Sequence, residues 1–395
     1  DEMTQSFPAL KQHIESHTDH GDYKKRSATV VIPVVFHVVS KSVAENLAIS
    51  YLNAQIDLLN QCYARENSDT VNMRSIYSSR VGKSKIRFYI DQVKRVSTTM
   101  TAFNASSTSG FANSDIVKQT GSGGSDAVSP STKLNIWICD LKFDGTDGLV
   151  GYAYPPIGAP NWPVGSGAPS ANFDGVVIDY LDVGGPAKQP LGYSSYGFRG
   201  KALVHEIGHY LGLRHIWGDD NGACPGQVGY KDDGITDTPV TDENSNFDCN
   251  KTKNSCTESS GDLPDMVENY MDYSAESCQN SFTKMQIGAM EYVLDNIRTG
   301  VRLPLGMEES VDLSKQISVY PNPVSEMLYV DMQDLTFNNV TLRLTNSIGQ
   351  MVMTASQTNT HTPLEMDCSD FAKGLYFLQL VLDGQHTITQ KVQIK

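Results

Sequence analysis

The first regular pattern in the chain is an almost unbroken apolar run over residues 29–39, TVVIPVVFHVV. Such a run is typical of a strand that is buried on both faces of a sheet. Residues 45–65 follow with Leu52, Ile56 and Leu59 at helical spacing, which predicts a helix that packs against this sheet. His37 lies inside the apolar run and is expected to be a core histidine rather than a metal ligand.

Four shorter segments predict further strands: residues 85–93, 133–141, 148–156 and 174–182. An edge strand among the last two would be able to bind an extended peptide by strand addition. The connection over residues 97–132 is rich in Ser, Thr, Gly and Asn and is typical of a long surface loop. A last helix is expected over roughly residues 284–298.

The pattern changes near the C-terminus. Residues 300–316 contain turn residues and acidic side chains without periodicity, and short alternating segments separated by turns follow, as in a β-sandwich. We therefore divide the chain into an N-terminal segment (1–27), a main domain (28–304), a linker (305–316) and a small all-β domain (317–395). The N-terminal segment is polar and bears three histidines, so a solvated segment, a remnant of a pro-segment and a second metal site all remain open.

Composition narrows the class of partner. At 395 residues, two domains are the natural expectation, and the net charge of -14 argues against nucleic acid or an anionic membrane as a partner. The same negative charge favours the binding of a cation such as calcium. No stretch reaches the roughly 18–20 apolar residues of a membrane span. No signal peptide is visible either, so we expect this chain to begin after its removal.

Four of the seven cysteines lie close together in a loop-like region: Cys224, Cys249, Cys256 and Cys278. Their spacings are unlike the CxxC pairs of metal clusters, so a disulfide framework is favoured, which implies export from the cell. Four cysteines allow three pairings.

The strongest chemical signal is the segment from His205 to His215, HEIGHYLGLRH. His205 and His209 lie four residues apart on a predicted helix and can share one metal ion, with Glu206 beside them. Gly212 can end the helix in a left-handed turn that returns His215 as a third ligand. Two histidines at this spacing occur by chance in ordinary helices, but the glycine and the third histidine at these offsets argue against chance. Three imidazoles with an open fourth position are typical of catalytic zinc.

Two further segments bear on the site. Met271 lies in the turn-forming sequence NYMDY and corresponds to the methionine turn found beneath the metal of metzincins. Residues 232–239, DDGITDTP, combine carboxylates with a turn glycine, as oxygen ligands for calcium require, although a solvated acidic loop is the alternative.

Residues 28–300 resemble the pappalysin family of metzincin metallopeptidases through IPVVFHVV, LNIWICDL, FDGVVIDY, HEIGHYLGLRHIWGDD, DGITDTP and NYMDYSAESCQNSFTKMQ. The resemblance implies an α+β zincin fold, with a twisted mixed sheet, a backing helix and an active-site helix. It also implies a zinc endopeptidase with the three histidines as ligands, Glu206 as general base and acid toward a zinc-activated water, and Tyr273 near the reacting carbonyl. Residues 317–395 resemble the C-terminal sorting domain of the type IX secretion system of Bacteroidota through VYPNPV, SIGQ, GLYFLQL and KVQIK. This likeness implies a protein that is secreted or held at the cell surface.

The same resemblance extends to details of the site. It implies a calcium ion held by Asp233, Ile235 and Thr238, and it implies two disulfides, Cys224–Cys256 and Cys249–Cys278. In bacterial pappalysins that cleave before Arg or Lys, an acid immediately before the last of these cysteines is thought to read the substrate. Here that position is Ser277, with Glu276 one residue earlier, so we expect a relaxed preference for Arg or Lys after the scissile bond.

Two other functions compete with a secreted endopeptidase that acts on proteins or peptides. An exopeptidase would use the same zinc chemistry at chain ends. A secreted binding or adhesion protein with an inactive metalloprotease-like domain is the alternative from another class, and the intact ligand set and base argue against it.

Overall fold

The computed structural model describes residues 29–159, 161–185, 200–218, 223–258, 260–302, 317–332, 339–346, 349–358, 363–382 and 386–395. The chain divides into two compact units, residues 1–305 and 306–395, which are described separately. The expected N-terminal segment and linker lie outside the described residues.

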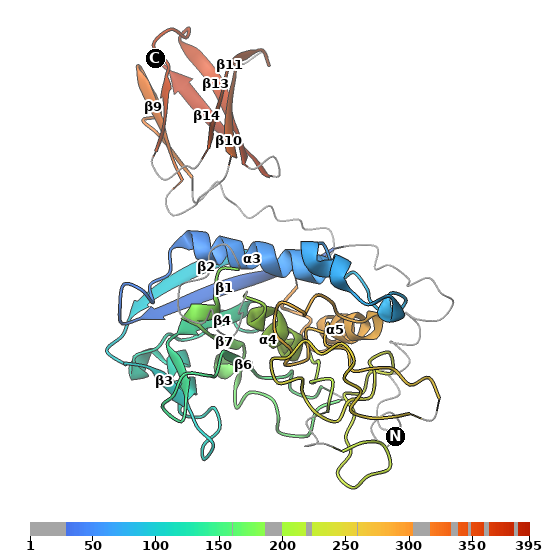
Figure 1. The fold of residues 1–395 in the computed structure, drawn as a ribbon. Helices are drawn as coiled ribbons and strands as arrows, with labels where there is room; N and C mark the ends of the chain where they lie inside the picture. The colour runs from blue at the N-terminus through green and yellow to red at the C-terminus, as the bar shows by residue number, and fades with distance from the viewer. Residues whose placement is uncertain are drawn as a thin grey trace. The chain divides into compact units, whose positions relative to one another are not determined.

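A five-stranded mixed sheet forms the centre of the first unit, in the order β2-β1-β4-β7-β6 (Figure 1). Its strands are β1 (Val30–Ser40), β2 (Ile86–Ser97), β4 (Leu134–Cys139), β6 (Gly151–Ala153) and β7 (Val176–Asp179). The pairs β2-β1, β1-β4 and β4-β7 are parallel, whereas β6 runs antiparallel to β7 at the edge of the sheet. The strand predicted from the first apolar run is confirmed, since ten of the eleven side chains of β1 are buried.

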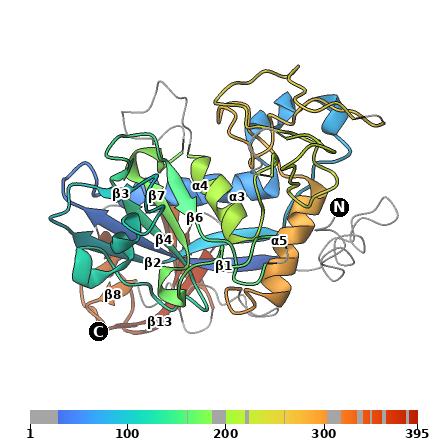
Figure 2. The same cartoon turned by 90° about the horizontal axis from the view of Figure 1, so that it is seen from below.

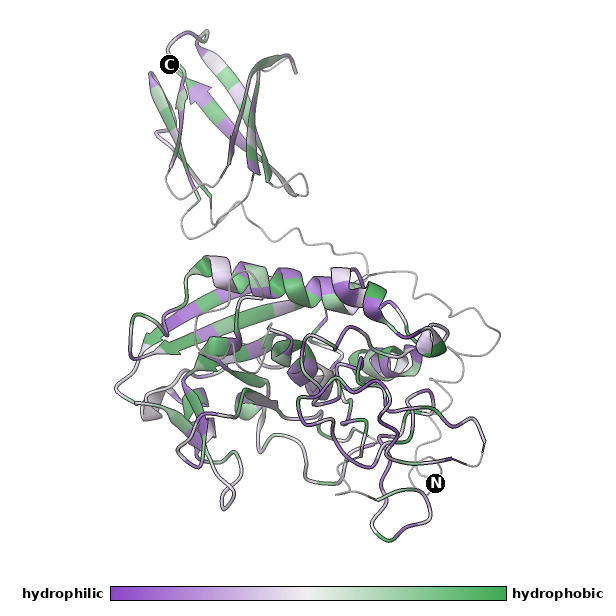
Figure 3. Ribbon diagram, viewed as in Figure 1, coloured by the Kyte–Doolittle hydropathy of each residue, from purple (hydrophilic) through white to green (hydrophobic). Residues whose placement is uncertain are grey.

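Helices α3 (Ile49–Ala64) and α4 (Ala202–Tyr210) pack on one face of the sheet, in a single core with Ile32 and Val34 of β1 and Ile136 of β4. The side chains that α3 buries include the predicted positions Leu52, Ile56 and Leu59. Apolar residues run along most of β1 in Figure 3, whereas the outer surface of α3 is mixed. This arrangement confirms the expected backing helix and active-site helix.

The opposite face of the sheet is covered by the segment that was predicted to be a surface loop. Phe103 and Val117 from this segment are fully or almost fully buried against Trp137 of β4. The segment contains β3 (Phe103–Ala105), which pairs with β5 (Leu141–Phe143), and the 3-10 turns η3 (Ser114–Lys118) and η4 (Thr120–Ser122). Most of this segment is polar, but a few of its apolar and charged side chains are buried against the sheet. The prediction of a surface loop was therefore wrong for these residues.

The remaining elements of the first unit are short, apart from one helix. Helix α5 (Lys284–Asn296) begins at a capping box. The Thr283 hydroxyl accepts from the Gln286 amide, and Oε1 of Gln286 accepts from the Thr283 amide. The other 3-10 turns are η1 (Ser68–Asn72), η2 (Ser75–Tyr77), η5 (Ala171–Phe173) and η6 (Tyr180–Asp182). Among the described residues, no helix is both long and apolar enough to cross a membrane.

The second unit is the expected all-β domain, with a four-stranded sheet ordered β11-β10-β13-β14 and a three-stranded sheet ordered β12-β9-β8. All of their pairings are antiparallel. One apolar core, which includes Leu328, Leu344 and Leu378, holds strands from both sheets. The strands are β8 (Ser318–Tyr320), β9 (Met327–Asp331), β10 (Asn339–Asn346), β11 (Met351–Thr358), β12 (Leu364–Asp367), β13 (Gly374–Leu382) and β14 (His386–Ile394).

Candidate active site

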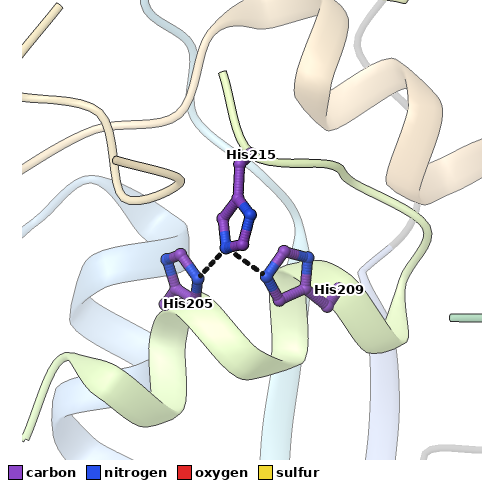
Figure 4. A group of neighbouring side chains, drawn as sticks. All are labelled: His205, His209 and His215. Carbon is purple, nitrogen blue, oxygen red and sulfur yellow. Dashed lines mark hydrogen bonds between the residues drawn. The ribbon is translucent and has the colours of Figure 1, made fainter. Parts of the chain in front are cut away.

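Three histidines converge at the C-terminal end of α4 (Figure 4). His205 and His209 project from one face of the helix, and His215 returns toward them from the segment that follows. Nε2 of His215 lies 3.2 Å from Nε2 of His205 and 3.0 Å from Nε2 of His209. The structure therefore brings together the three ligands expected from the sequence.

The return of the chain depends on the conformation of Gly212. Its φ is +92°, a region that residues with a side chain rarely adopt, and an added Cβ would lie 2.8 Å from Cγ2 of Val293. Two side chains hold the turn by donating to the Gly212 carbonyl, Asn161 through Nδ2 at 2.9 Å and Trp162 through Nε1 at 3.0 Å. Glycine is thus required for both backbone and packing reasons.

The hydrogen bonds of the imidazole rings fix which nitrogen faces the centre of the cluster. Nδ1 of His205 lies 2.6 Å from the Tyr270 carbonyl, and Nδ1 of His209 lies 2.8 Å from the Leu213 carbonyl. A carbonyl can only accept, so both protons sit on Nδ1 and both Nε2 atoms carry lone pairs. His215 can donate to at most one of them. Its own ring stacks on Trp217, with centroids 4.2 Å apart.

Converging lone pairs of this kind fit a cation. A tetrahedral zinc ion with Zn–N bonds near 2.0–2.1 Å would hold its nitrogens about 3.3–3.4 Å apart, close to the separations observed here. Burial, together with His209 and His215, lowers the pKa of His205 well below its ordinary value, so the ring stays neutral and able to bind metal. The residues present therefore fit a zinc ion.

The turn that contains Met271, predicted to be the methionine turn, packs against α4. Met271 is fully buried, and a Cβ added to Gly208 of the helix would lie 2.5 Å from the Met271 Sδ. Asn269 fixes the turn, because its Oδ1 accepts from the Met271 amide at 2.9 Å while its Nδ2 donates to Gln286 of α5. The Met271 carbonyl in turn accepts from the Ile216 amide, next to the third histidine, at 3.3 Å.

Tyr273 lies beside the three histidines, on their exposed side. Its ring centroid is 4.7 Å from that of His215, 5.4 Å from that of His205 and 4.9 Å from that of Trp217. The side chain is 40% exposed, which leaves it accessible to a bound molecule. Tyr273 thus borders the three-histidine cluster.

Glu206 is buried between α4 and the edge of the sheet. Burial raises the pKa of its carboxyl to about 8. A Cβ added to Gly151 of β6 would lie 3.0 Å from Cγ of Glu206, so strand and carboxylate stem are in direct contact.

Glu276 and Ser277, which were considered for substrate recognition, differ in their surroundings. Glu276 is buried, and its Oε1 accepts from the Ala202 amide at 2.7 Å in the first turn of α4. Lys201 donates to the Glu276 carbonyl at 2.8 Å. Ser277 is exposed. Glu276 therefore anchors the active-site helix.

The acidic loop folds around Asp233, whose side chain is 2% exposed. Its Oδ1 accepts from the Ile235 amide at 2.9 Å, and the Thr238 hydroxyl lies 3.1 Å from its Oδ2 and 2.6 Å from the Ile235 carbonyl oxygen. Burial and the neighbouring Asp232 raise the pKa of Asp233 well above its ordinary value. The three residues expected to bind calcium thus lie together.

Comparison with known proteins decides the family. A family model described as pregnancy-associated plasma protein-A matches residues 125–295. The solved structure of mature mirolysin from Tannerella forsythia, in complex with a cleaved peptide, is 32% identical, with a TM-score of 0.58 over 70% of this chain and 97% of that chain. The chain belongs to the pappalysin family of metalloproteases.

Other relatives of this pappalysin agree with that assignment. A promirolysin variant from the same organism is 30% identical, with a TM-score of 0.59 over 75% of this chain and 91% of that chain. An extracellular metalloprotease from Arthroderma benhamiae is 28% identical over 274 residues, which is 69% of this chain and 75% of that protein. A secretion system C-terminal sorting domain matches residues 318–395. The protein is thus a metalloprotease with a secretion tail.

The pappalysin has two disulfides, Cys224–Cys256 and Cys249–Cys278. These are the pairings that the family resemblance implied. The other three cysteines, Cys62, Cys139 and Cys368, are free and buried.

Sequence reasoning missed the residues that support the ligands from outside the motif. Trp217, Trp162 and Asn161 contact His215 or the Gly212 turn, yet they lie in irregular segments with no period that could reveal a contact. The one available signal is that Trp217 follows His215 by two residues, within reach of the third ligand.

Proposed function

We propose that this pappalysin is a secreted zinc endopeptidase with Glu206 as its general base and acid. The observation that carries the proposal is the convergence of three imidazole Nε2 atoms, with the buried carboxylate of Glu206 next to His205 in the helix. Three nitrogen ligands with a fourth position left for water are the pattern of catalytic rather than structural zinc.

Each residue has a definite part in this mechanism. When bound, zinc would supply a Lewis acid and a water molecule of lowered pKa. His205, His209 and His215 would hold it through Nε2, and the carbonyls at Nδ1 of the first two fix their ring orientation. Glu206 takes a proton from the attacking water and returns it to the leaving amine. The Tyr273 hydroxyl donates to the carbonyl oxygen as negative charge develops there.

The test is hydrolysis of casein by the wild type and by Glu206→Ala, with and without a zinc chelator. We expect the variant to retain zinc and to lose at least about 10²-fold of rate. Glu66→Ala, at an exposed glutamate just after α3, is the matched control and should cleave like the wild type. Activity of Glu206→Ala within tenfold of the wild type would remove Glu206 from this role.

The same assay separates the competing functions. Internal cleavage of long peptides, mapped by mass spectrometry, is expected of an endopeptidase, whereas release of terminal residues alone would indicate an exopeptidase. Full zinc occupancy without cleavage of any peptide in a broad library would favour a binding protein with an inactive domain.

We further propose a relaxed preference for Arg or Lys after the scissile bond. Ser277 offers only a neutral hydroxyl, and the Glu276 carboxylate is engaged by the Ala202 amide. Digestion of a peptide library should therefore show Arg or Lys enriched after the cut without being required. Ser277→Asp is expected to sharpen the preference, and an unchanged profile would place substrate reading elsewhere.

We also propose calcium at the acidic loop. Asp233, Ile235 and Thr238 supply a carboxylate, a carbonyl and a hydroxyl, the hard oxygen ligands that calcium prefers. A buried carboxylate needs compensation of its charge, and a bound cation would provide it. Calcium should raise the melting temperature of the wild type but not that of Asp233→Asn, and equal shifts in both would exclude this loop.

A further inference from the structure

The edge strand β6 lies beside α4, the helix that bears the proposed catalytic carboxylate (Figure 2). At Gly151, an added Cβ would meet Cγ of Glu206 at 3.0 Å and the Val177 carbonyl oxygen at 2.9 Å, so only glycine permits this approach. β6 is also the outermost strand of the sheet, where an extended peptide can add by main-chain hydrogen bonds. The position of β6 therefore sets how far a paired peptide lies from Glu206.

Lys118, a buried cation at the end of η3, contacts the tyrosines of β6 and of the residues just after it. Lys118 has a fully buried side chain and pairs with Asp115 at 2.8 Å. Asp115 in turn accepts from the hydroxyls of Tyr152, on β6, at 2.9 Å and of Tyr154, just after it, at 2.6 Å. The Lys118 ammonium also lies 4.9 Å and 4.6 Å from the centroids of these two rings and donates to the Phe173 carbonyl at 2.8 Å.

A second buried cation, Arg298, contacts the same end of β6. Arg298, just after α5, forms a two-pronged ion pair with Asp174 and donates to the Tyr154 carbonyl at 3.5 Å. Its Nε donates to the Tyr210 carbonyl at 2.8 Å, at the last residue of α4, and its guanidinium lies 3.6 Å from the Tyr210 ring centroid. Arg298 thereby joins the end of the metal-binding helix to the end of β6.

The two cations converge on the same short piece of chain. Both reach Tyr154, Lys118 through Asp115 and Arg298 directly, and they bind the consecutive residues Phe173 and Asp174. Burying an ion pair carries a desolvation cost that neutral donors would avoid. At the opposite edge of the sheet a neutral group suffices, because the Asn60 amide binds both the amide and the carbonyl of Phe88 on β2.

We propose that Lys118 and Arg298 are positioning residues that fix edge strand β6 for pairing with the backbone of an extended peptide substrate, at a set distance from Glu206. The inference rests on the peptidase activity proposed above. It predicts that weakening the contacts of either cation with β6 reduces the binding of long peptides more than that of short peptides. Only the long peptides are able to pair with the strand.

The test compares Tyr154→Phe with Asn60→Ala. Tyr154→Phe removes one hydroxyl bond to Asp115 and keeps the ring, whereas Asn60→Ala removes the bonds that hold the opposite edge strand and serves as the matched control. For a peptide of about ten residues, we expect Tyr154→Phe to raise KM about 3- to 10-fold, the effect of one hydrogen bond, with kcat little changed. A peptide too short to span β6 should show no such rise, and Asn60→Ala should leave the ratio between the two peptides at its wild-type value.

Hydrogen exchange supplies a readout that does not depend on activity. The amides of residues 151–154 should exchange faster in Tyr154→Phe and in Arg298→Lys, which keeps the charge but loses the planar fork. The same amides should also exchange faster in Lys118→Met, which removes the charge. If that variant fails to fold, the double variant Lys118→Met with Asp115→Asn replaces it, because it leaves no unpaired buried charge.

The outcomes separate the possibilities. Equal effects on long and short peptides, or an equal effect of Asn60→Ala, would show that the two cations only stabilise the fold. A wild type that cleaves no peptide would refute the proposed activity, while faster exchange of β6 in the variants alone would still support the role of the cations in holding the strand.

Discussion

Replacement of Gly212 by alanine should destabilise the metal-binding unit more than a single methyl group ordinarily does. Two separate costs add at this position. A φ of +92° is unfavourable for alanine by about 1–2 kcal/mol. The new Cβ would also lie 2.8 Å from Cγ2 of Val293, which is buried, and such overpacking costs about 1–3 kcal/mol. The expected loss of unfolding free energy is therefore about 2–5 kcal/mol.

A second substitution separates the two costs. Val293→Ala removes the methyl group that the new side chain meets, so the double variant should be less destabilised than the sum of the single variants by about 1–3 kcal/mol. The backbone cost remains in the double variant, because it depends on φ and not on the neighbour.

Urea unfolding followed by tryptophan fluorescence measures these changes. All three tryptophans, Trp137, Trp162 and Trp217, lie in the first unit, so the signal reports that unit alone. A chelator in every sample removes the contribution of bound metal to stability. A Gly212→Ala variant within about 0.5 kcal/mol of the wild type, the range of a neutral surface substitution, would refute the reasoning on both backbone and packing.

Four further outcomes are expected. His215→Ala should lower zinc occupancy in elemental analysis, and full occupancy would show that another group is the third ligand. Burial lowers the pKa of His37 to about 4, below its unfolded value near 6.5, so its contribution to stability is complete above pH 6.5 and is lost as the pH falls toward 4. This loss of about 3 kcal/mol in urea unfolding should be absent from His37→Gln, and an equal pH slope in both proteins would contradict it. Replacing both Cys249 and Cys278 by serine should cost about 3–4 kcal/mol, since the bridge closes a loop of 29 residues, and an unchanged urea midpoint would refute this. Deletion of residues 306–395 should leave casein cleavage intact while stopping export in a host with the matching secretion system; a folded but inactive product would show that the second unit contributes to the site.

Much of the fold follows from local pattern. α3 was predictable because the side chains that it buries recur at helical spacing, and β1 because its unbroken apolar run is typical of a strand buried on both faces. The strand order was not, since the placement of β6 beside β7 depends on tertiary contacts such as that of Gly151 with Glu206. A three-residue strand also carries too little sequence for its ends to be defined by alternation.

The candidate site divides in the same way. The three histidines and Glu206 lie within eleven residues, so their spacing alone predicts a shared metal. Glu276 is different, because its sequence position does not tell which way the turn directs its carboxylate. In the structure the carboxylate faces the first turn of α4 and accepts from the Ala202 amide. Lys118 and Arg298 escaped notice for another reason: isolated basic residues are usually solvated, and only the assembled fold reveals that these two are buried.

The two disulfides bear on self-cleavage, in which one copy of the protease cuts another. The described residues of the region that they span, 224–258 and 260–278, form no helix or strand, and those that are exposed could be cut by another copy of the enzyme. The bridges overlap, because Cys249 lies inside the loop closed by Cys224–Cys256, while Cys278 lies outside it. Any single cut between Cys224 and Cys278 therefore leaves its two pieces joined by at least one covalent bridge. A molecule nicked in this region keeps Tyr273 and Met271 tethered to the helix that bears the histidines.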